Sequence, residues 1–131
     1  MSTEQNKETV QAFYDASNRG DMETCMSLIA DDIVWQNIGT TALSGRFEGK
    51  RELQDKLLGP LFGRLRAGIS TQIIRLVAEG DYVVAQTQGT AETVDGRPYN
   101  NQYCWIIRLR DGQFAEVSEY MDTELITRAF G

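Results

Sequence analysis

The sequence predicts one α+β domain in which helices pack on a curved antiparallel sheet and enclose a small-molecule pocket. Apolar residues near the N-terminus recur at helical spacing, whereas the second half of the chain has the pattern of four long strands. Short turns join those strands, and two of them contain Asp-Gly, the strongest local signal for a β-hairpin. A chain of 131 residues without a linker or repeat has the usual size of one domain. We therefore predict a single domain over residues 1–131.

The N-terminal region predicts two helices. Ser2 or Thr3 can cap the first helix, and Gly20 can end it by C-cap chemistry. Asp21 can then cap a short second helix. Three large apolar or aromatic residues of the first helix share one side, namely Val10, Phe13 and Tyr14.

The period then changes to two, which predicts a strand with Trp35 and Asn37 on one face. Residues 39–45 are small and polar and indicate a loop. A third helix is expected from about Lys50, broken at Gly59-Pro60 because proline lacks the helical N–H donor and clashes with the preceding turn. The four long strands are expected at residues 69–78, 82–93, 98–109 and 113–122.

Composition argues against several classes of function. The chain has no histidine and only two distant cysteines, Cys25 and Cys104, so we expect neither a metal nor catalysis by a histidine-activated nucleophile. We expect no other cofactor. A formal net charge of −6 argues against nucleic acid, whose phosphates are neutralised by Lys and Arg. The chain lacks an apolar run long enough to span a membrane and its N-terminus is unlike a signal peptide, so we expect a cytoplasmic protein that does not bind membranes.

One face of the predicted sheet has an unusual composition for a core. It mixes apolar and aromatic residues with amides and one carboxylate: Gln86, Gln88, Asn101, Tyr103, Trp105, Val117, Glu119 and Met121. Buried amides and carboxylates are costly unless satisfied, and an apolar cavity with a few converging polar groups is typical of a small-molecule site. Two other interpretations stay open: a face assignment shifted by one residue, or polar groups along a solvent-exposed edge.

Two short motifs add a family resemblance. Phe47-Glu48-Gly49-Lys50 precedes the third helix, and Glu119-Tyr120-Met121-Asp122 follows an Asp-Gly hairpin. With the chain length and the order of elements, these motifs resemble the nuclear-transport-factor-2-like (NTF2-like) superfamily, in its branch of SnoaL-like polyketide cyclases, ketosteroid isomerases and limonene-epoxide hydrolases. The resemblance implies a conical barrel, a curved and mostly antiparallel sheet wrapped around N-terminal helices and enclosing a pocket.

The resemblance also implies a homodimer through the outer face of the sheet. One row of the second long strand consists of small side chains that would suit sheet-on-sheet packing, and we expect it on that outer face: Val83, Ala85, Thr87, Gly89 and Ala91.

The limonene-epoxide hydrolases suggest roles for several residues. Trp35-Gln36-Asn37 resembles their Tyr-Gln-Asn, so Asn37 keeps an amide that helps hold the nucleophilic water, and Trp35 offers an indole donor in place of the phenol. Glu119 takes the place of a catalytic aspartate. The arginine and aspartate that these hydrolases carry two residues apart would fall on Gln86 and Gln88, and neither amide can act as a base.

The ketosteroid isomerases suggest a different use of the same pocket. Their proton-shuttling aspartate falls at or next to Asn37, which cannot abstract a proton. Tyr14 lies at a depth in the first helix where it could mimic their phenol donor, although an aromatic residue on an apolar helical stripe can also be simply core.

Our leading hypothesis from the sequence is an isomerase, cyclase or hydrolase that performs cofactor-free acid/base chemistry on a small hydrophobic metabolite. Glu119 would be the general acid/base, and Asn37 would be the second catalytic residue. The substrate would contact Tyr14, Trp35 and the other residues of the predicted pocket face: Gln86, Gln88, Asn101, Tyr103, Trp105, Val117 and Met121. The alternatives are a non-catalytic protein that binds a small molecule in this pocket, and a dimerisation module of the same fold.

Overall fold

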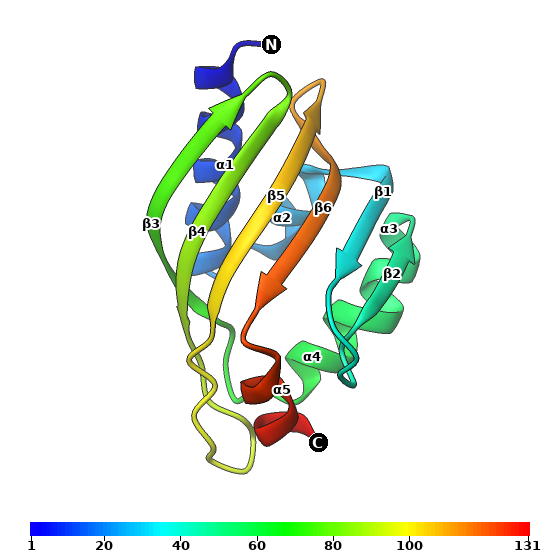
Figure 1. Cartoon of the computed structure of the whole chain (residues 1–131), viewed down its shortest axis with the longest axis vertical. Helices are drawn as coiled ribbons and strands as arrows, with labels where there is room; N and C mark the ends of the chain where they lie inside the picture. Colours follow the sequence, from blue (N-terminus) through cyan, green and yellow to red (C-terminus); the bar gives the residue numbers. More distant parts are fainter.

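The computed structural model describes residues 1–131 and has an open, curved sheet with helices on one face (Figure 1). The N-terminal half contains α1 (Thr3–Asn18), α2 (Met22–Ser27), β1 (Ile29–Asn37), β2 (Gly45–Glu48), α3 (Lys50–Leu53), a π-helical turn (Gln54–Leu58) and α4 (Gly59–Gly63). The C-terminal half contains β3 (Ser70–Glu79), β4 (Tyr82–Thr90), β5 (Gln102–Arg110), β6 (Gln113–Met121) and α5 (Thr123–Phe130). The expected α+β class and the four long strands are therefore confirmed, whereas β2 and α5 were not predicted.

All six strands belong to one sheet with the order β2-β1-β6-β5-β4-β3. Every neighbouring pair is antiparallel except β1 and β6, which are parallel. Since β2 and β3 are free edges, the sheet does not close, and the expected barrel is corrected to a curved open sheet. Helix α1 packs against β3 and β4, on the face that we call concave (Figure 1).

The ends of the first two helices follow the signals in the sequence. Ser2 caps α1 through a capping box with Gln5, and Gly20 adopts a φ of 76° just after the helix. The side chain of Asp21 accepts a hydrogen bond from the backbone N–H of Thr24 at the start of α2. These caps fix where α1 ends and α2 begins, and so bring both helices to the same side of the sheet.

The third helical segment is not broken at Gly59-Pro60, contrary to our prediction. A π-helical turn lets the backbone N–H of Gly59 bond to the carbonyl of Gln54, five residues earlier, and Pro60 then lies at the start of α4. The helical path therefore continues from Lys50 to Gly63. Four apolar side chains of this path reach the interior of the domain or its edge: Leu57, Leu58, Leu61 and Phe62.

The predicted faces of β4 are reversed in the structure. Ala85 pairs with Trp105 and Thr87 pairs with Tyr103, so the row of small side chains is concave and buried. Gln86 is exposed on the convex face, opposite Cys104, and Gln88 is opposite Gln102. The expectation that both glutamines face the pocket is therefore wrong, as is the expectation that the small residues form the outer face. Small side chains leave room for α1 to pack on this strand.

The core lies between the concave face and the helices. Its largest fully buried side chains come from α1, β1, β4, β5, β6 and α5 and from the third helical path, and include Val10, Ile33, Leu53, Ile107 and Phe114. None of the helices combines the length and apolar character needed to cross a bilayer. One region of the interior keeps polar groups, and it contains the candidate site.

Candidate functional site

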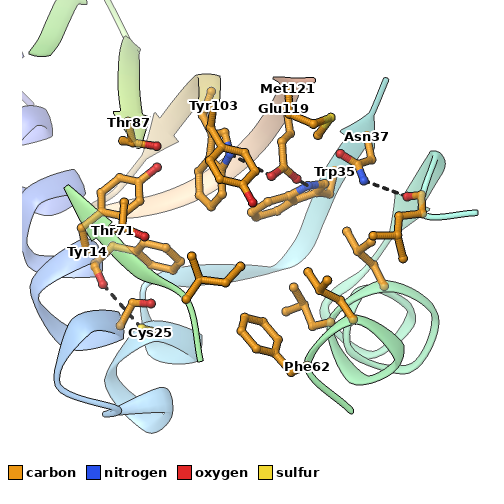
Figure 2. Close-up of a pocket in the computed structure, with 18 of the residues that line it drawn as sticks. Tyr14, Cys25, Trp35, Asn37, Phe62, Thr71, Thr87, Tyr103, Glu119 and Met121 are labelled. Carbon is orange, nitrogen blue, oxygen red and sulfur yellow. Dashed lines mark hydrogen bonds between the residues drawn. The ribbon is translucent and has the colours of Figure 1, made fainter. Parts of the chain in front are cut away.

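A chamber of about 90 Å³ lies between the concave face and the helices (Figure 2). Most of its walls are apolar, with side chains from α1, α2, β1, the third helical path and β3 to β6. Its polar lining residues are few: Tyr14, Ser17, Asn37, Thr71, Thr87, Tyr99, Tyr103 and Glu119. An apolar cavity with a few converging polar groups is the usual form of a small-molecule site.

Glu119 is the only ionisable carboxylate in this chamber, and it is 9% exposed. It lies on the concave face of β6, where it is paired with Trp105 of β5 and with Asn37 of β1. The indole nitrogen of Trp35 donates a hydrogen bond to Oε1 at 3.1 Å, and that of Trp105 donates one to Oε2 at 3.0 Å. Each oxygen therefore has one neutral donor, and the plane of the carboxylate is fixed.

The surroundings of Glu119 move its titration close to neutral pH. Burial raises the pKa of Glu119 from 4.5 to about 7, and the two indole hydrogen bonds only partly oppose this effect. No lysine or arginine lines the chamber, so no cation compensates the negative charge. Arg64 binds the carbonyl of Phe130 instead, and Arg75 lies on the convex face opposite Gln86. The group can therefore both take up and release a proton near pH 7.

The two indoles that hold Glu119 also pack on each other. Trp35 and Trp105 meet edge to face, with ring centroids 4.9 Å apart. Trp105 is further packed against the rings of Phe13 and Tyr14. This aromatic cluster restricts the rotamers of both indoles, so the two donors are held toward the carboxylate.

Asn37 stands beside Glu119 on the neighbouring strand. Its Nδ2 donates a 2.7 Å hydrogen bond to the carbonyl of Leu43, which fixes the orientation of the amide. Its Oδ1 is buried and has no hydrogen-bond partner within the protein. The amide therefore presents an acceptor next to the carboxylate, as Figure 2 shows.

Tyr14 provides an unpartnered hydroxyl on another side of the chamber. The residue is 3% exposed, and its hydroxyl lies near Thr87 but outside regular hydrogen-bond geometry. Burial, with a contribution from the Glu119 charge, raises the pKa of Tyr14 well above its usual 10.0. The phenol therefore stays protonated and is available as a neutral donor.

Some of the other predicted site residues line the chamber and others do not. Tyr103 and Met121 line the chamber with Tyr14, Trp35, Asn37, Trp105 and Glu119. Val117 is on the same face but is buried in the core outside the chamber lining. Asn101 precedes β5 and is fully engaged: it donates to the carbonyl of Asp122 and accepts from two backbone N–H groups, so it anchors a loop.

Gln86 and Gln88 do not reach the chamber. The Gln88 amide instead donates to the backbone carbonyls of Gly89, Asn100 and Asn101. The corresponding concave positions of β4 are Ala85 and Thr87, and neither side chain is ionisable.

The sequence pattern misses several residues of the chamber wall, including Phe13, Cys25, Leu57, Phe62, Thr71 and Thr87. The apolar stripe of the first helix could have identified Phe13, and the row of small residues in β4 could have identified Thr87. No pattern in the sequence places Phe62 near the chamber, because it gets there through the π-helical turn.

The family model of the SnoaL-like domain matches residues 10–117 of the chain. The chain belongs to the SnoaL-like domain family. A curated relative, epoxide hydrolase EphG of Mycobacterium tuberculosis (strain ATCC 25618 / H37Rv), is 30% identical over 115 residues, which cover 86% of this chain and 70% of EphG.

Solved structures share the fold of this SnoaL-like domain. An NTF2-like protein of unknown function from Burkholderia pseudomallei K96243 has a TM-score of 0.84 at 20% identity, with 98% of each chain covered. A limonene-epoxide-hydrolase-like (LEH-like) epoxide hydrolase of M. tuberculosis has a TM-score of 0.77 at 24% identity, with 97% of this chain and 90% of that chain covered. The family model therefore confirms the expected SnoaL-like family, and these structures confirm the fold.

Proposed function

We propose that this SnoaL-like domain catalyses cofactor-free proton transfer on a small hydrophobic metabolite, with Glu119 as the general acid/base. The observation that carries the proposal is the position of Glu119, a lone buried carboxylate held by two indoles and without a cation. A structural ion would normally have a charged partner, because an uncompensated buried charge is costly. A general base, in contrast, works best when its pKa is close to the working pH.

An isomerase or cyclase reaction would use the chamber as follows. Ionised Glu119 takes a proton from the carbon next to a carbonyl group, and the electrons of that C–H bond pass to the carbonyl oxygen to give an enolate. A neutral phenol, for which Tyr14 is the unpartnered candidate, donates a hydrogen bond to this oxygen. In a β,γ-unsaturated carbonyl compound, protonated Glu119 then returns the proton to the γ-carbon of the dienolate. In a cyclisation, the enolate carbon instead attacks a second carbonyl group and closes a ring, and the alkoxide that forms takes the proton from Glu119.

Hydrolysis is a related use of the same residues, supported by the 30% identity to epoxide hydrolase EphG. A water could donate one hydrogen to Glu119 and the other to the free Oδ1 of Asn37, since both are acceptors next to each other. However, the arginine and aspartate expected from limonene-epoxide hydrolases have no counterpart in the chamber. We therefore favour isomerisation or cyclisation.

A non-catalytic binding protein is the second candidate, and one observation favours it. Both oxygens of Glu119 already accept an indole hydrogen bond. A carboxylate fixed in this way could simply orient the polar group of a bound ligand.

The test is the conversion of the open-chain ketone 4-penten-2-one to its conjugated isomer 3-penten-2-one, which is followed by the rise in ultraviolet absorbance. We expect Glu119→Gln to abolish the acceleration, because an amide cannot exchange the proton. Glu116→Gln is the matched control, since Glu116 is on the same strand but pairs with Arg108 on the convex face. Equal rates for Glu119→Gln and the wild type would contradict a role for Glu119. Binding of the ketone without any acceleration would instead favour the binding protein.

A further inference from the structure

The chamber borders a larger recess at the surface, which we call the outer groove. The groove measures about 580 Å³ and lies between α2, the third helical path and the start of β3. Six residues line both spaces, namely Ser17, Met22, Met26, Leu58, Phe62 and Ile69. Phe62 is on the side of the chamber away from Glu119 (Figure 2). The shared residues therefore place the groove next to the chamber, on the side away from Glu119.

The two spaces differ greatly in size. An engineered cavity of about 150 Å³ binds benzene, so the 90 Å³ chamber accommodates a group smaller than a six-membered aromatic ring. The groove is several times larger. A metabolite of ordinary size therefore cannot be enclosed by the chamber alone, and most of its atoms would be in the groove.

The chemistry of the residues shared by the chamber and the groove indicates which kind of ligand group fits beside them. Met22 is 45% exposed although it lines the chamber, and Met26, Leu58 and Phe62 are partly exposed. Apolar side chains around an opening are explained by an apolar occupant, and methionine adapts easily to the shape of a ligand. Arg66 is the only charged residue of the groove, and it already pairs with Glu92 at 3.3 Å. The groove thus favours a neutral aliphatic chain.

We propose that the chamber and the outer groove are connected between their shared residues and that the groove is a second subsite, which binds the aliphatic chain of a ligand whose short polar head lies in the chamber beside Glu119. Met22, Met26 and Phe62 then determine the chain length that the protein accepts. The inference rests on the proposed function only for the placement of the polar head, and the binding of the chain requires no turnover.

The experiment measures the binding of linear methyl ketones from 2-butanone to 2-decanone through the fluorescence of Trp35 and Trp105, the two tryptophans of the chain, both in the chamber wall. Each buried methylene should lower Kd about threefold to fourfold. We expect this gain to continue beyond 2-hexanone, because the added methylenes enter the groove. A plateau at 2-hexanone, or the absence of binding at every length, would overturn the inference.

Two glycine substitutions provide a matched pair. Gly68 lines the groove, Gly63 does not, and an added Cβ has no heavy atom within 4 Å at either position. Gly68→Phe should remove the gain for 2-octanone and 2-decanone but leave 2-butanone binding unchanged, whereas Gly63→Phe should change neither. Full retention of the gain in Gly68→Phe would contradict the subsite.

Comparing this binding series with the isomerase assay separates this inference from the proposed function. Chain-length dependence that persists without any isomerase activity in the wild type would leave the subsite intact and overturn the enzyme. Isomerase activity without chain-length dependence would support the enzyme and overturn the subsite.

Discussion

Trp105 and Glu119 stand directly opposite each other on β5 and β6, and the indole nitrogen donates a 3.0 Å hydrogen bond to Oε2 of the carboxylate. Trp35 completes the arrangement from β1 by binding Oε1. The chain therefore holds a buried carboxylate with two neutral donors. This arrangement stabilises the anion enough for it to exist near pH 7 but not enough to keep it permanently ionised.

The titration of Glu119 can be observed directly through these indoles. We expect two indole N–H signals in a ¹H–¹⁵N spectrum, both shifting downfield as the pH rises through about 7, because a carboxylate is a stronger acceptor than a carboxylic acid. Glu119→Gln serves as the control, and in this variant the chemical shifts of both signals should not change over this pH range. Two different midpoints, or midpoints near 4.5, would show that Glu119 is not the common titrating group.

Removing one donor should raise the pKa of Glu119 further. In Trp105→Phe we expect an increase of about one unit, since a hydrogen bond to a charged group exceeds a neutral one by roughly 1 kcal/mol. The remaining Trp35 signal reports the new midpoint. Trp35→Phe is the reciprocal variant and should act in the same direction. An unchanged midpoint in both variants would mean that the indoles do not stabilise the anion.

The raised pKa of Glu119 makes the stability of the protein depend on pH. Between pH 4.5 and about 7 the folded state holds a proton that the unfolded state has released, so the free energy of unfolding falls as the pH rises through this window. The contribution of Glu119 is on the order of 3 kcal/mol. We expect urea titrations to show that the free energy of unfolding of the wild type, relative to that of Glu119→Gln, decreases by this amount between pH 4.5 and about 7. Parallel pH profiles of the two proteins would contradict the shift.

Gly59 should be essential for the π-helical turn. A Cβ at this position would lie 2.9 Å from the carbonyl oxygen of Gln54. We expect Gly59→Ala to lower the free energy of unfolding by about 1–3 kcal/mol, which denaturant titration measures. Gly63→Ala is the control in the same helical path, where the added Cβ meets no atom within 4 Å, and it should be neutral or mildly stabilising. Equal stabilities of the two variants would show that the turn relaxes freely.

Homodimerisation remains a prediction, and the structure changes its expected basis. The convex face exposes five large apolar side chains: Ile74, Val77, Tyr82, Ile106 and Tyr120. We expect light scattering to give about twice the chain mass of 14.7 kDa, and Ile106→Arg to give the monomer because it places a charge in the interface. Val94→Arg is the control at an exposed site outside the sheet strands. A monomeric wild type at micromolar concentration would contradict the prediction.

Local signals in the sequence were sufficient for most elements and for part of the site. The caps at Ser2 and Asp21 predict where the first two helices begin, since they act within one turn of the backbone. The alternation along β1 and β6 places Trp35, Asn37 and Glu119 on one face, because a strand with one apolar row has only one way to bury it.

The sequence alone could not decide the orientation of β4. One row of this strand contains Gln86 and Gln88 with larger apolar residues, and the other contains small residues such as Ala85 and Thr87, so neither row is a clear core face. The packing of α1 on β4 decided it. Gly89 is also closely packed on the concave face, because a Cβ there would meet Ile69 and Tyr103 at 3.0 Å.

The environment of Glu119 was likewise decided by tertiary structure. Trp35 is 84 residues away from Glu119 in the chain, and only the parallel pairing of β1 with β6 brings its indole to the carboxylate. The sequence determined that a carboxylate would lie among aromatic residues on the concave face. The assembled sheet determined that its partners are two indoles and not the glutamines or an arginine, because hydrogen-bond partners depend on register and rotamers that no local pattern encodes.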